Sequence, residues 1–446
     1  MTYHNSQPVP KKEQLMSNID QLSNCHPVAE AQWFMERTAF LERRSMEILA
    51  AWIWNTPHLD SKLSFGLHAY EDATHADLCF HRKKELQPGL PSYGWKPRSL
   101  DLAALDLICR EVVQAVTLPC KLSGLYGALK PWLLNRYEEY LRAADPILEG
   151  PTLRILDRII QEERLQIVWA REWLEKQVEN DSSAREEAEQ WRRRITHRLD
   201  NLTGLASDEA NGQASSSWPL MDFTGQPPAC DPRLNIVFYT PGRGPSAPVE
   251  FDPQNETEIQ QVMLSTLVVV ETEAAELVGR ILVEFPDLPW QMRFDLCRQM
   301  WDECRHAASQ WRLLRHLGAD LGVYPSIAYI NLFVGDEPDV LKRLIVLQRV
   351  VEGISVDQHR PRGRYFLKEG IYPLVQMFDY ILADEDNHIG LSSWIRVVAG
   401  KDQNRLEELA RYQAIKEQEY SDYSDWLISK RRDLARLFPP SKNAGR

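Results

Sequence analysis

The sequence lacks any arrangement of cysteines typical of a disulfide framework or a thiolate metal site. Its seven cysteines are an odd number, lie scattered along the 446 residues and never form a C-x-x-C pair. Disulfide-stapled secreted domains and zinc ribbons are therefore poor descriptions of this chain. The cysteine usage instead favours a reduced, cytoplasmic protein.

Long apolar runs and an excess of positive charge are also missing. The apolar stretch Leu264–Val270 is interrupted by Ser265 and Thr266, and a membrane helix needs roughly 20 apolar residues. Residues 1–10 are polar, so we expect no secretory signal. With 64 acidic and 52 basic side chains, the net charge is −12. The composition therefore indicates neither a nucleic-acid partner nor attachment to a membrane.

Helical periodicity is what the sequence does contain. Apolar residues recur every three or four positions over most of the chain, and prolines stand near the ends of these stretches. The stretch Leu234–Tyr239 is the best candidate for a strand, and Pro131 predicts a kink or a break inside a helix. We therefore expect an all-α protein. The predicted helices are 29–54, 63–86, 122–143, 152–176, 182–202, 256–285, 291–317, 339–359, 373–398 and 403–437.

A change in composition near the middle predicts the domain organisation. Residues 206–254 are rich in serine, glycine and proline, and they indicate a long loop or linker. A linker of this length is ordinary between domains and unusual within one. We expect a helical domain at 1–205 and another at 255–446.

Three patterns recur in the two halves, in the same order and at a nearly constant separation. One pattern, E-x-x-small-x-E-apolar, begins at Glu42 and again at Glu271. The others pair residues 70–76 with 301–307, and 160–167 with 382–389. These matches predict an internal duplication that produced two tandem four-helix bundles. The alternative is two unrelated bundles that share acidic amphipathic helices.

Two Glu-x-x-His pairs in the second half carry the chemical signal. Residues three apart share one face of a helix, so Glu303 and His306 point the same way, as do Glu385 and His388. Two such pairs, joined by one glutamate from each of two further helices, form the dimetal sites of ferritin-like bundles. A single pair would be a weak signal in so acidic a chain.

Spacing selects the two further glutamates. Glu271 interrupts an otherwise apolar helix face, and Glu352 stands at the end of an apolar run. The interval from Glu271 to the first Glu-x-x-His pair is almost the same as the interval from Glu352 to the second pair. An unpaired buried carboxylate is costly, and a metal centre would remove that cost. A set of four carboxylates and two imidazoles suits iron or manganese better than structural zinc.

The residues 302–306 (DECRH) and 384–388 (DEDNH) resemble the D-E-x-R-H and D-E-x-x-H motifs of bacterial multicomponent monooxygenases. They are also similar to motifs in the small subunit of class I ribonucleotide reductase and in the di-iron tRNA hydroxylase. The chain thus resembles the ferritin-like di-iron carboxylate superfamily, and its two copies resemble a group of bacterial ferritin-like proteins. The resemblance covers both halves but not the linker or the final helix. The implied metal ligands are Glu271, Glu303, His306, Glu352, Glu385 and His388.

The resemblance also implies a role for the aspartate before each ligand glutamate. In those families this aspartate hydrogen-bonds a ligand histidine of the other pair, which fixes the tautomer and the basicity of the imidazole. The role would fall to Asp302 and Asp384, which would otherwise be solvated helix acids.

The first half departs from the pattern. Glu42, Asp72, His75 and Glu163 keep a carboxylate or an imidazole, but Gln166 stands in place of His388 and Lys130 in place of Glu352. We expect a degenerate site, metal-free or nearly so, in which the charge of Lys130 replaces that of a metal. The alternative is one weakly held ion on the four residues that could still ligate.

The resemblance implies a non-haem centre with two Fe, or with Mn/Fe or Mn/Mn, that uses O2 as co-substrate. We expect an oxidoreductase, a monooxygenase or an oxidase, that acts on a small organic molecule and draws on an external electron donor or reductase. We expect the protein to be a monomer or a homodimer. Gln310 stands where the resemblance would place a radical tyrosine, which disfavours a reductase subunit. The alternatives are a non-catalytic iron-binding protein, a ferroxidase, a redox-stress protein or a metal-free scaffold.

The sequence leaves open the roles of His359, Glu273 and Glu276. His359 shares a helix face with Glu352 and either approaches the centre or is a satisfied or exposed histidine; we favour the second interpretation. Glu273 and Glu276 are expected to be solvated or salt-bridged.

Overall fold

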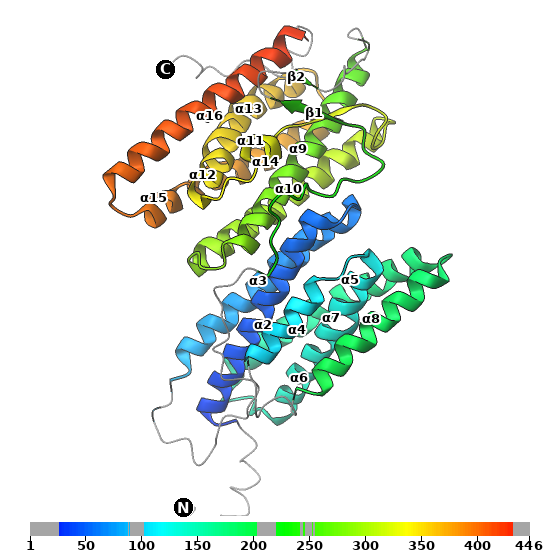
Figure 1. The fold of residues 1–446 in the computed structure, drawn as a ribbon, viewed down its shortest axis with the longest axis vertical. Helices are drawn as coiled ribbons and strands as arrows, with labels where there is room; N and C mark the ends of the chain where they lie inside the picture. The colour runs from blue at the N-terminus through cyan, green and yellow to red at the C-terminus, as the bar shows by residue number, and fades with distance from the viewer. Residues whose placement is uncertain are drawn as a thin grey trace, which may run out of the picture. The chain divides into compact units, whose positions relative to one another are not determined.

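The described residues fold almost entirely into helices (Figure 1), which confirms the all-α prediction. The structure is a computed structural model. It describes residues 26–87, 89, 102–202, 220–240, 244–245, 252 and 255–430.

The chain divides into two compact units. The first takes Met1–Arg44 and Thr74–Ala214, and the second takes Ser45–Ala73 and Ser215–Arg446. The division falls inside two long helices, α2 and α3, so each of them contributes residues to both units. The predicted domain bounds, 1–205 and 255–446, did not anticipate that residues 45–73 group with the second half. As bounds of a duplication they stay a prediction.

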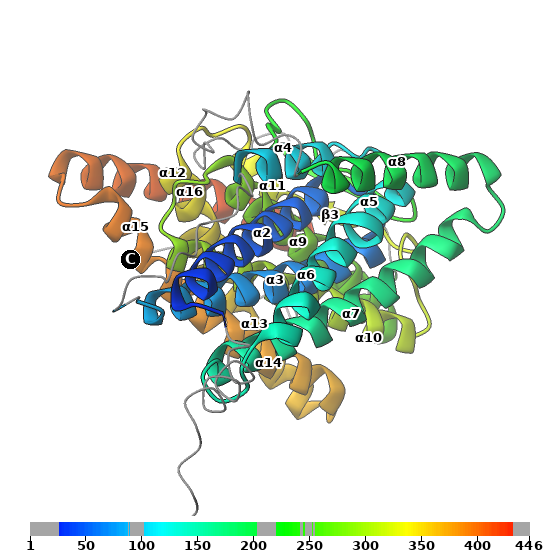
Figure 2. The ribbon, with the colours of Figure 1, turned by 90° about the horizontal axis from the view of Figure 1, so that it is seen from below.

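The first unit contains residues 28–44 of α2 and residues 74–85 of α3, together with five further α-helices and a π-helical turn. Helices α5, α7 and α8 run side by side (Figures 1 and 2). The side chains of Thr117 and Asp181 cap the first turns of α5 and α8, as short polar side chains do. The elements are α2 (Val28–Asn55), α3 (Leu59–Glu85), α4 (Leu102–Val113), α5 (Leu118–Gly124), η1 (Leu125–Leu129), α6 (Lys130–Ala143), α7 (Gly150–Val178) and α8 (Ser182–Asp200).

The second unit is built around a four-helix bundle of α9, α10, α13 and α14 (Figure 1). Apolar side chains from these four helices form one core cluster that includes Met263, Leu314, Phe366 and Phe378. The long helices are α9 (Glu256–Glu284), α10 (Trp290–His316), α13 (Glu352–Lys368), α14 (Tyr372–Leu391) and α16 (Gln403–Lys430). The shorter ones are α11 (Ile330–Val334), α12 (Val340–Ile345), the π-helical turn η2 (Val346–Val351) and α15 (Ser393–Ala399).

A π-helical turn interrupts the third bundle helix in each half. Turn η1 ends at Leu129, directly before Lys130, and η2 ends at Val351, directly before Glu352. The helix predicted over 122–143 therefore does not break at Pro131; it widens in the turn that precedes Lys130. A proline lacks the N–H that an α-helical bond would need, and a π turn accommodates such a loss. The shared position of the two turns favours the duplication, which stays a prediction.

The strand predicted over 234–239 is present as β1 (Ile236–Thr240). It pairs in parallel with β3 (Ser326–Ala328) and antiparallel with β2 (Gly244–Pro245). The residues before it also pack in the second unit, where Phe223 is buried and the N–H of Ala229 donates to Trp54 O. The described part of the predicted linker is thus an ordered component of this unit.

Residues 45–73 belong to the second unit because they meet α9 and α10 through buried contacts. Arg293 Nη2 donates to Glu47 Oε1 at 2.7 Å, and Lys62 forms an ion pair with Glu276. Both pairs are almost fully buried. Breaking such a pair leaves an uncompensated charge, so these contacts fix which segments pack together.

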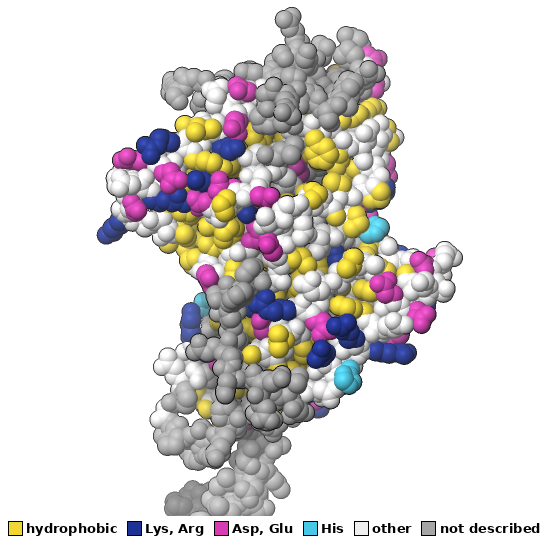
Figure 3. Space-filling model, viewed as in Figure 1, with side chains coloured by type: hydrophobic (Ala, Val, Ile, Leu, Met, Phe, Trp, Pro, Cys, Tyr) yellow, Lys and Arg dark blue, Asp and Glu magenta, His cyan; other side chains and the backbone are white. Residues whose placement is uncertain are grey.

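The surface over α12, α15 and α16 shows basic and acidic side chains intermixed (Figure 3). Lys342 on α12, for example, lies 3.0 Å from Glu408 on α16. Within the part of the chain that the structure describes, none of the helices has the length and hydropathy required to cross a bilayer.

Candidate metal centre

The four bundle helices of the second unit bring all six implied ligands together. Helix α9 supplies Glu271 and α13 supplies Glu352 as its first residue, while α10 and α14 each supply one Glu-x-x-His pair. Every one of the six is at most 5% exposed. The structure thus places side by side the glutamates and histidines that their spacing had selected.

The ligand atoms form two overlapping groups. One contains Glu271, Glu303, His306 and Glu385, the other contains Glu303, Glu352 and His388, and within each group the atoms lie within 4.8 Å of one another. Glu303 belongs to both groups. His388 Nδ1 lies 3.3 Å from Glu303 Oε1 and 3.4 Å from Glu385 Oε2.

The donor set fits two divalent metal ions. The Nδ1 atoms of His306 and His388 and the Oε2 atom of Glu385 are buried, and none of them has a hydrogen-bond partner among the described residues. Buried polar atoms without partners cost free energy, as do four carboxylates crowded together. Two divalent ions would balance four carboxylate charges and use both imidazole nitrogens. Carboxylate and imidazole ligands suit iron and manganese.

The pKa values of the clustered carboxyl groups also indicate that the cluster requires positive charge. Burial, followed by repulsion from Glu352, raises the pKa of Glu303 to about 8. Burial and the neighbouring Glu385 raise the pKa of Glu352 well above its usual range. Although burial opposes it, the neighbouring His306 and the amide of Gln310 lower the pKa of Glu271 to about 2. Without metal, protons would have to supply the positive charge that the cluster requires.

Two aspartates hold the outer nitrogens of the ligand histidines. His306 Nε2 lies 3.2 Å from Asp384, and His388 Nε2 lies 3.4 Å from Asp302. Each aspartate thus serves the histidine of the other pair, as the resemblance implies. With Nε2–H donating to an aspartate, Nδ1 of each ring is the nitrogen that faces the carboxylates and could ligate a metal. Arg305 donates to both aspartates.

Two glutamine side chains donate hydrogen bonds to the clustered carboxylates, which the sequence did not predict. Gln310 donates to Glu271 Oε1 at 2.8 Å. Gln299 donates to Glu303 at 3.1 Å and to Glu352 at 2.8 Å. A signal was available, because Gln299 stands one helical turn before Glu303 and Gln310 one turn after His306 on one face of α10.

A small cavity of about 50 Å³ adjoins the centre. One wall is apolar and includes Val262, Leu267 and Ala274 from α9. Polar side chains also line the cavity, and hydrogen bonds join Arg362 to Gln358 and His359, and Tyr329 to Tyr420. We call these five residues the polar end of the cavity. His359 is 2% exposed and lines the cavity beside the centre, so it is not exposed, and its Nδ1 accepts from Arg362. Burial and the charge of Arg362 lower the pKa of His359 to about 3, which keeps the ring neutral.

Glu273 and Glu276 face away from the ligands on α9. Both are buried, so neither is solvated. Glu276 forms the ion pair with Lys62 described above, in agreement with the salt-bridged alternative. Glu273 accepts backbone N–H groups from Tyr329, Ile330 and Asn331 at 2.8 to 3.2 Å and so anchors the start of α11.

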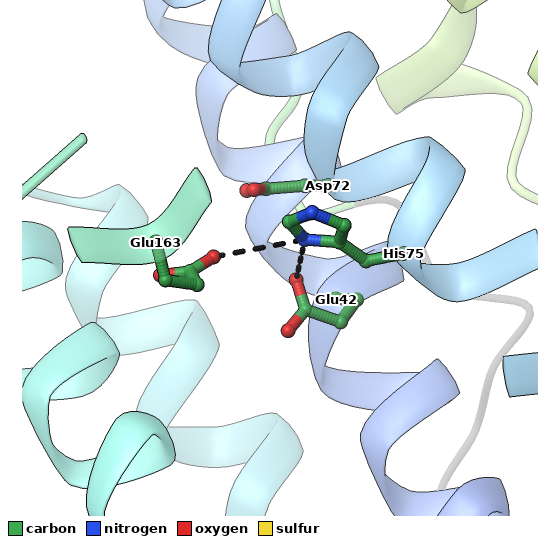
Figure 4. Close-up of side chains that lie close together, drawn as sticks. All are labelled: Glu42, Asp72, His75 and Glu163. Atoms are coloured by element: carbon green, nitrogen blue, oxygen red, sulfur yellow. Dashed lines mark hydrogen bonds and ion pairs between the residues drawn. The ribbon is translucent and has the colours of Figure 1, made fainter. Parts of the chain in front are cut away.

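The corresponding residues of the first half lie as close together (Figure 4). The carboxylates and the imidazole of Glu42, Asp72, His75 and Glu163 lie within 4.8 Å of one another. His75 Nδ1 lies 3.3 Å from Glu42 Oε2 and 3.9 Å from Glu163 Oε1. The ligand geometry alone is therefore no reason to exclude an ion here.

A lysine, a tyrosine and a further glutamate bond to the residues of this first cluster. Lys130 Nζ donates to Glu163 Oε1 at 2.6 Å, and Tyr137 donates to Glu42 Oε1 at 2.5 Å. His75 Nε2 lies 2.7 Å from Glu162 Oε2. The internal ion pair expected from Lys130 is present, and Gln166, buried on the same helix as Glu163, offers an amide where the second half has His388.

Comparison with known proteins adds one match. A family model described as "Protein of unknown function (DUF455)" matches residues 224–437, just under half of the chain. No curated protein and no solved structure matches the chain. The matched segment contains all six clustered residues of the second unit, and the first cluster lies outside it.

Proposed function

We propose that this protein is a dimetal oxidoreductase, an O2-activating oxygenase or oxidase that acts on a small organic molecule. The observation that carries the proposal is the arrangement around His306 and His388. Each ring presents an unpartnered Nδ1 to a cluster of buried carboxylates, while an aspartate holds its Nε2. Carboxylate-rich sites of this composition in four-helix bundles bind pairs of iron or manganese ions.

Each of the clustered residues would have its own role in such a centre. Glu271 and His306 would hold one ion, Glu352 and His388 the other, and Glu303 and Glu385 lie within reach of both. Bound as Fe/Fe, Mn/Fe or Mn/Mn, the ions would supply the electrons that reduce dioxygen, with an external donor restoring them. The aspartates keep each Nδ1 available, and the buried bundle excludes water from the reaction.

The surroundings of the centre favour chemistry on a separate substrate. A cavity with one apolar wall opens beside the ligands, and its size admits only a small or slender molecule. Gln310 donates an amide N–H to Glu271, so this position offers no phenol for a stable radical. Both features support an oxygenase or oxidase over a radical-storing subunit.

We further propose that the first cluster is metal-free and structural. Lys130 is fully buried and bonded to Glu163, and it supplies the positive charge that an ion would otherwise bring. Binding an ion there would bring cation next to cation, which a buried site disfavours.

Elemental mass spectrometry of the purified protein tests both proposals. We expect close to two Fe or Mn per chain, lost in the double variant Glu303→Ala, His306→Ala and retained in His75→Gln. About four ions per chain would overturn the metal-free first cluster. No transition metal after anaerobic reconstitution with ferrous iron would overturn the dimetal proposal.

Oxygen consumption then separates the chemical alternatives. A pool of small organic molecules is added to the iron-loaded protein, and dioxygen uptake is measured together with product formation. Uptake coupled to an organic product supports the oxygenase or oxidase. Dioxygen uptake that oxidises only ferrous iron, with no organic molecule converted in any pool, would favour the ferroxidase.

A further inference from the structure

The polar end of the cavity beside the metal centre contains a buried cation. Arg362 on α13 is 1% exposed and lines the cavity. Its guanidinium donates to Gln358 Oε1 at 2.9 Å and to His359 Nδ1 at 2.8 Å. Arginine remains charged even when buried, so this end of the cavity has a positive potential.

The bond from Arg362 fixes the tautomer of His359. A guanidinium has no acceptor, so Nδ1 of the ring must accept, and the proton of the neutral imidazole therefore sits on Nε2. This Nε2–H is buried and has no acceptor among the described residues. A buried donor without a partner costs free energy that an incoming acceptor would recover.

The cavity thus joins a cationic, donor-rich end to an apolar wall and a metal centre. The hydroxyl groups of Tyr329 and Tyr420, 3.1 Å apart, lie at the same end and add further donors. Glu271, which under the proposed function also ligates metal, acts electrostatically on Arg362. Metal binding would draw the charge of Glu271 away from Arg362 and strengthen the attraction for another anion.

We propose that the substrate of this centre is a small carboxylic acid whose carboxylate binds His359 Nε2–H and the guanidinium of Arg362, with its hydrocarbon part along Leu267 and Ala274 toward the metals. The proposal rests on the proposed function for the reaction, though not for the binding. An amine would be repelled by Arg362, and a neutral hydrocarbon would leave the donor of His359 unsatisfied.

Binding of matched ligand pairs tests the substrate class. Straight-chain carboxylates from acetate to decanoate, and benzoate, are titrated into the full-length protein by calorimetry, each beside its neutral amide. Metal-free and metal-loaded protein are both used, and the metal content is measured in each. We expect at least one carboxylate to bind about tenfold or more tightly than its amide, as a charged hydrogen bond to a buried partner would give.

Variants on α13 assign the effect to the cavity. We expect Arg362→Gln to weaken binding of that carboxylate by about tenfold or more, Arg362→Lys to restore part of it, and His359→Leu to weaken it as well. Arg364→Gln, on an exposed position of the same helix, should leave it within about twofold. A carboxylate that binds only through the metals would be insensitive to Arg362→Gln.

The outcomes separate the two proposals. Metal-loaded protein that shows no preference for any carboxylate over its amide overturns the substrate class and leaves the dimetal proposal standing. Equal binding to wild type and Arg362→Gln overturns it too. Selective binding to a protein that takes up no metal even after reconstitution with ferrous iron would instead support the cavity and overturn the dimetal centre. If Arg362→Gln fails to fold, His359→Leu and the comparison of acid with amide in the wild type decide.

Discussion

The imidazoles of His306 and His388 each connect a carboxylate cluster to an aspartate, and the two aspartates are joined in turn by Arg305. An aspartate at Nε2 stabilises the tautomer whose Nδ1 lone pair can bind metal, and it makes that nitrogen more basic. At the residue scale, the affinity for metal should therefore depend on side chains that never touch it.

We predict that Asp302→Asn weakens metal binding by about 10- to 100-fold, because the histidine loses its charged acceptor. Asp384→Asn should have an effect of similar size through His306. Competition with a chelator of known affinity measures the change. The exposed neighbour Asp386 provides the control, and its asparagine variant should bind like wild type. Unchanged affinity in both buried variants would contradict the role assigned to the aspartates.

The first cluster permits a prediction about pH. Although burial alone lowers it, the hydrogen bonds to Glu162 and Glu42 raise the pKa of His75 to about 10. An unfolded histidine titrates near pH 6.5, so the contribution of charged His75 to stability is complete below about 6.5 and is lost as the pH rises through about 10. The pKa values of Glu42 and Glu162 are lowered, so their part is present above about pH 4.5.

We therefore expect His75→Gln to lower the free energy of unfolding by about 3–5 kcal/mol at pH 6, the usual cost of breaking a buried ion pair. The difference from wild type should shrink steadily toward pH 10. Urea unfolding at pH 6, 8 and 10 measures it, with the exposed His81→Gln on the same helix as control. A difference that does not change with pH would be incompatible with a charged His75.

At the scale of elements, the two π turns place the residue that follows them. One extra residue per turn rotates the rest of the helix by about 100° relative to an uninterrupted α-helix. Turn η2 therefore determines that Glu352 faces the ligand cluster, and η1 does the same for Lys130. Periodicity analysis assumes a constant helical repeat, so it could find Glu352 as an acid after an apolar run but not the turn that aims it.

A close helix crossing within the second unit gives a prediction at this scale. A Cβ atom added at Gly279 on α9 would lie 2.7 Å from the carbonyl oxygen of Ala50 on α2. We expect Gly279→Ala to destabilise the protein by about 1–3 kcal/mol, since one of the two backbones must shift. At Gly390 on α14 an added Cβ meets nothing within 4 Å, so Gly390→Ala should stabilise by up to about 1 kcal/mol.

Thermal unfolding of the two alanine variants beside wild type makes the comparison. Alanine is the better helix former at both positions, so only the crossing separates them. Stabilisation of the protein by both substitutions would show that α2 and α9 can move apart at no cost.

At the scale of the whole molecule, the sequence predicted which helix faces are buried far better than which segments contact one another. The positions of the long helices, the strand at 234–239 and the clustering of six carboxylate and histidine residues could be predicted, because each depends on local periodicity or on a short motif. The ion pair between Lys62 and Glu276 could not, since its partners are far apart in the sequence and neither position carries a local signal. Helix α4 (Leu102–Val113) was missed although its apolar face is regular.

The same reasoning explains why the predicted domains did not group residues 45–73 with the second half. The break in composition at 206–254 is real, but composition carries no information about packing, and residues 45–73 complete a core whose other helices come only after that break. Glu273 was likewise expected to be solvated or salt-bridged, because an acidic side chain is ordinarily exposed or paired. Its three backbone donors come from residues 329–331, on a distant part of the chain.

The final prediction concerns a fragment of residues 215–446, which carries all six clustered residues but lacks 45–73. Without that segment, Arg293 loses Glu47 and Glu276 loses Lys62, and each buried charge left alone costs about 3–5 kcal/mol. That total is comparable to the stability of a whole domain, about 5–15 kcal/mol. We expect the fragment to aggregate and to hold no metal, whereas co-expression with residues 26–87, which span α2 and α3, should restore a soluble complex. Gel filtration with metal analysis of the eluted peak measures both properties, and a monomeric fragment that binds two ions unaided would show that the second unit needs nothing from the first helices.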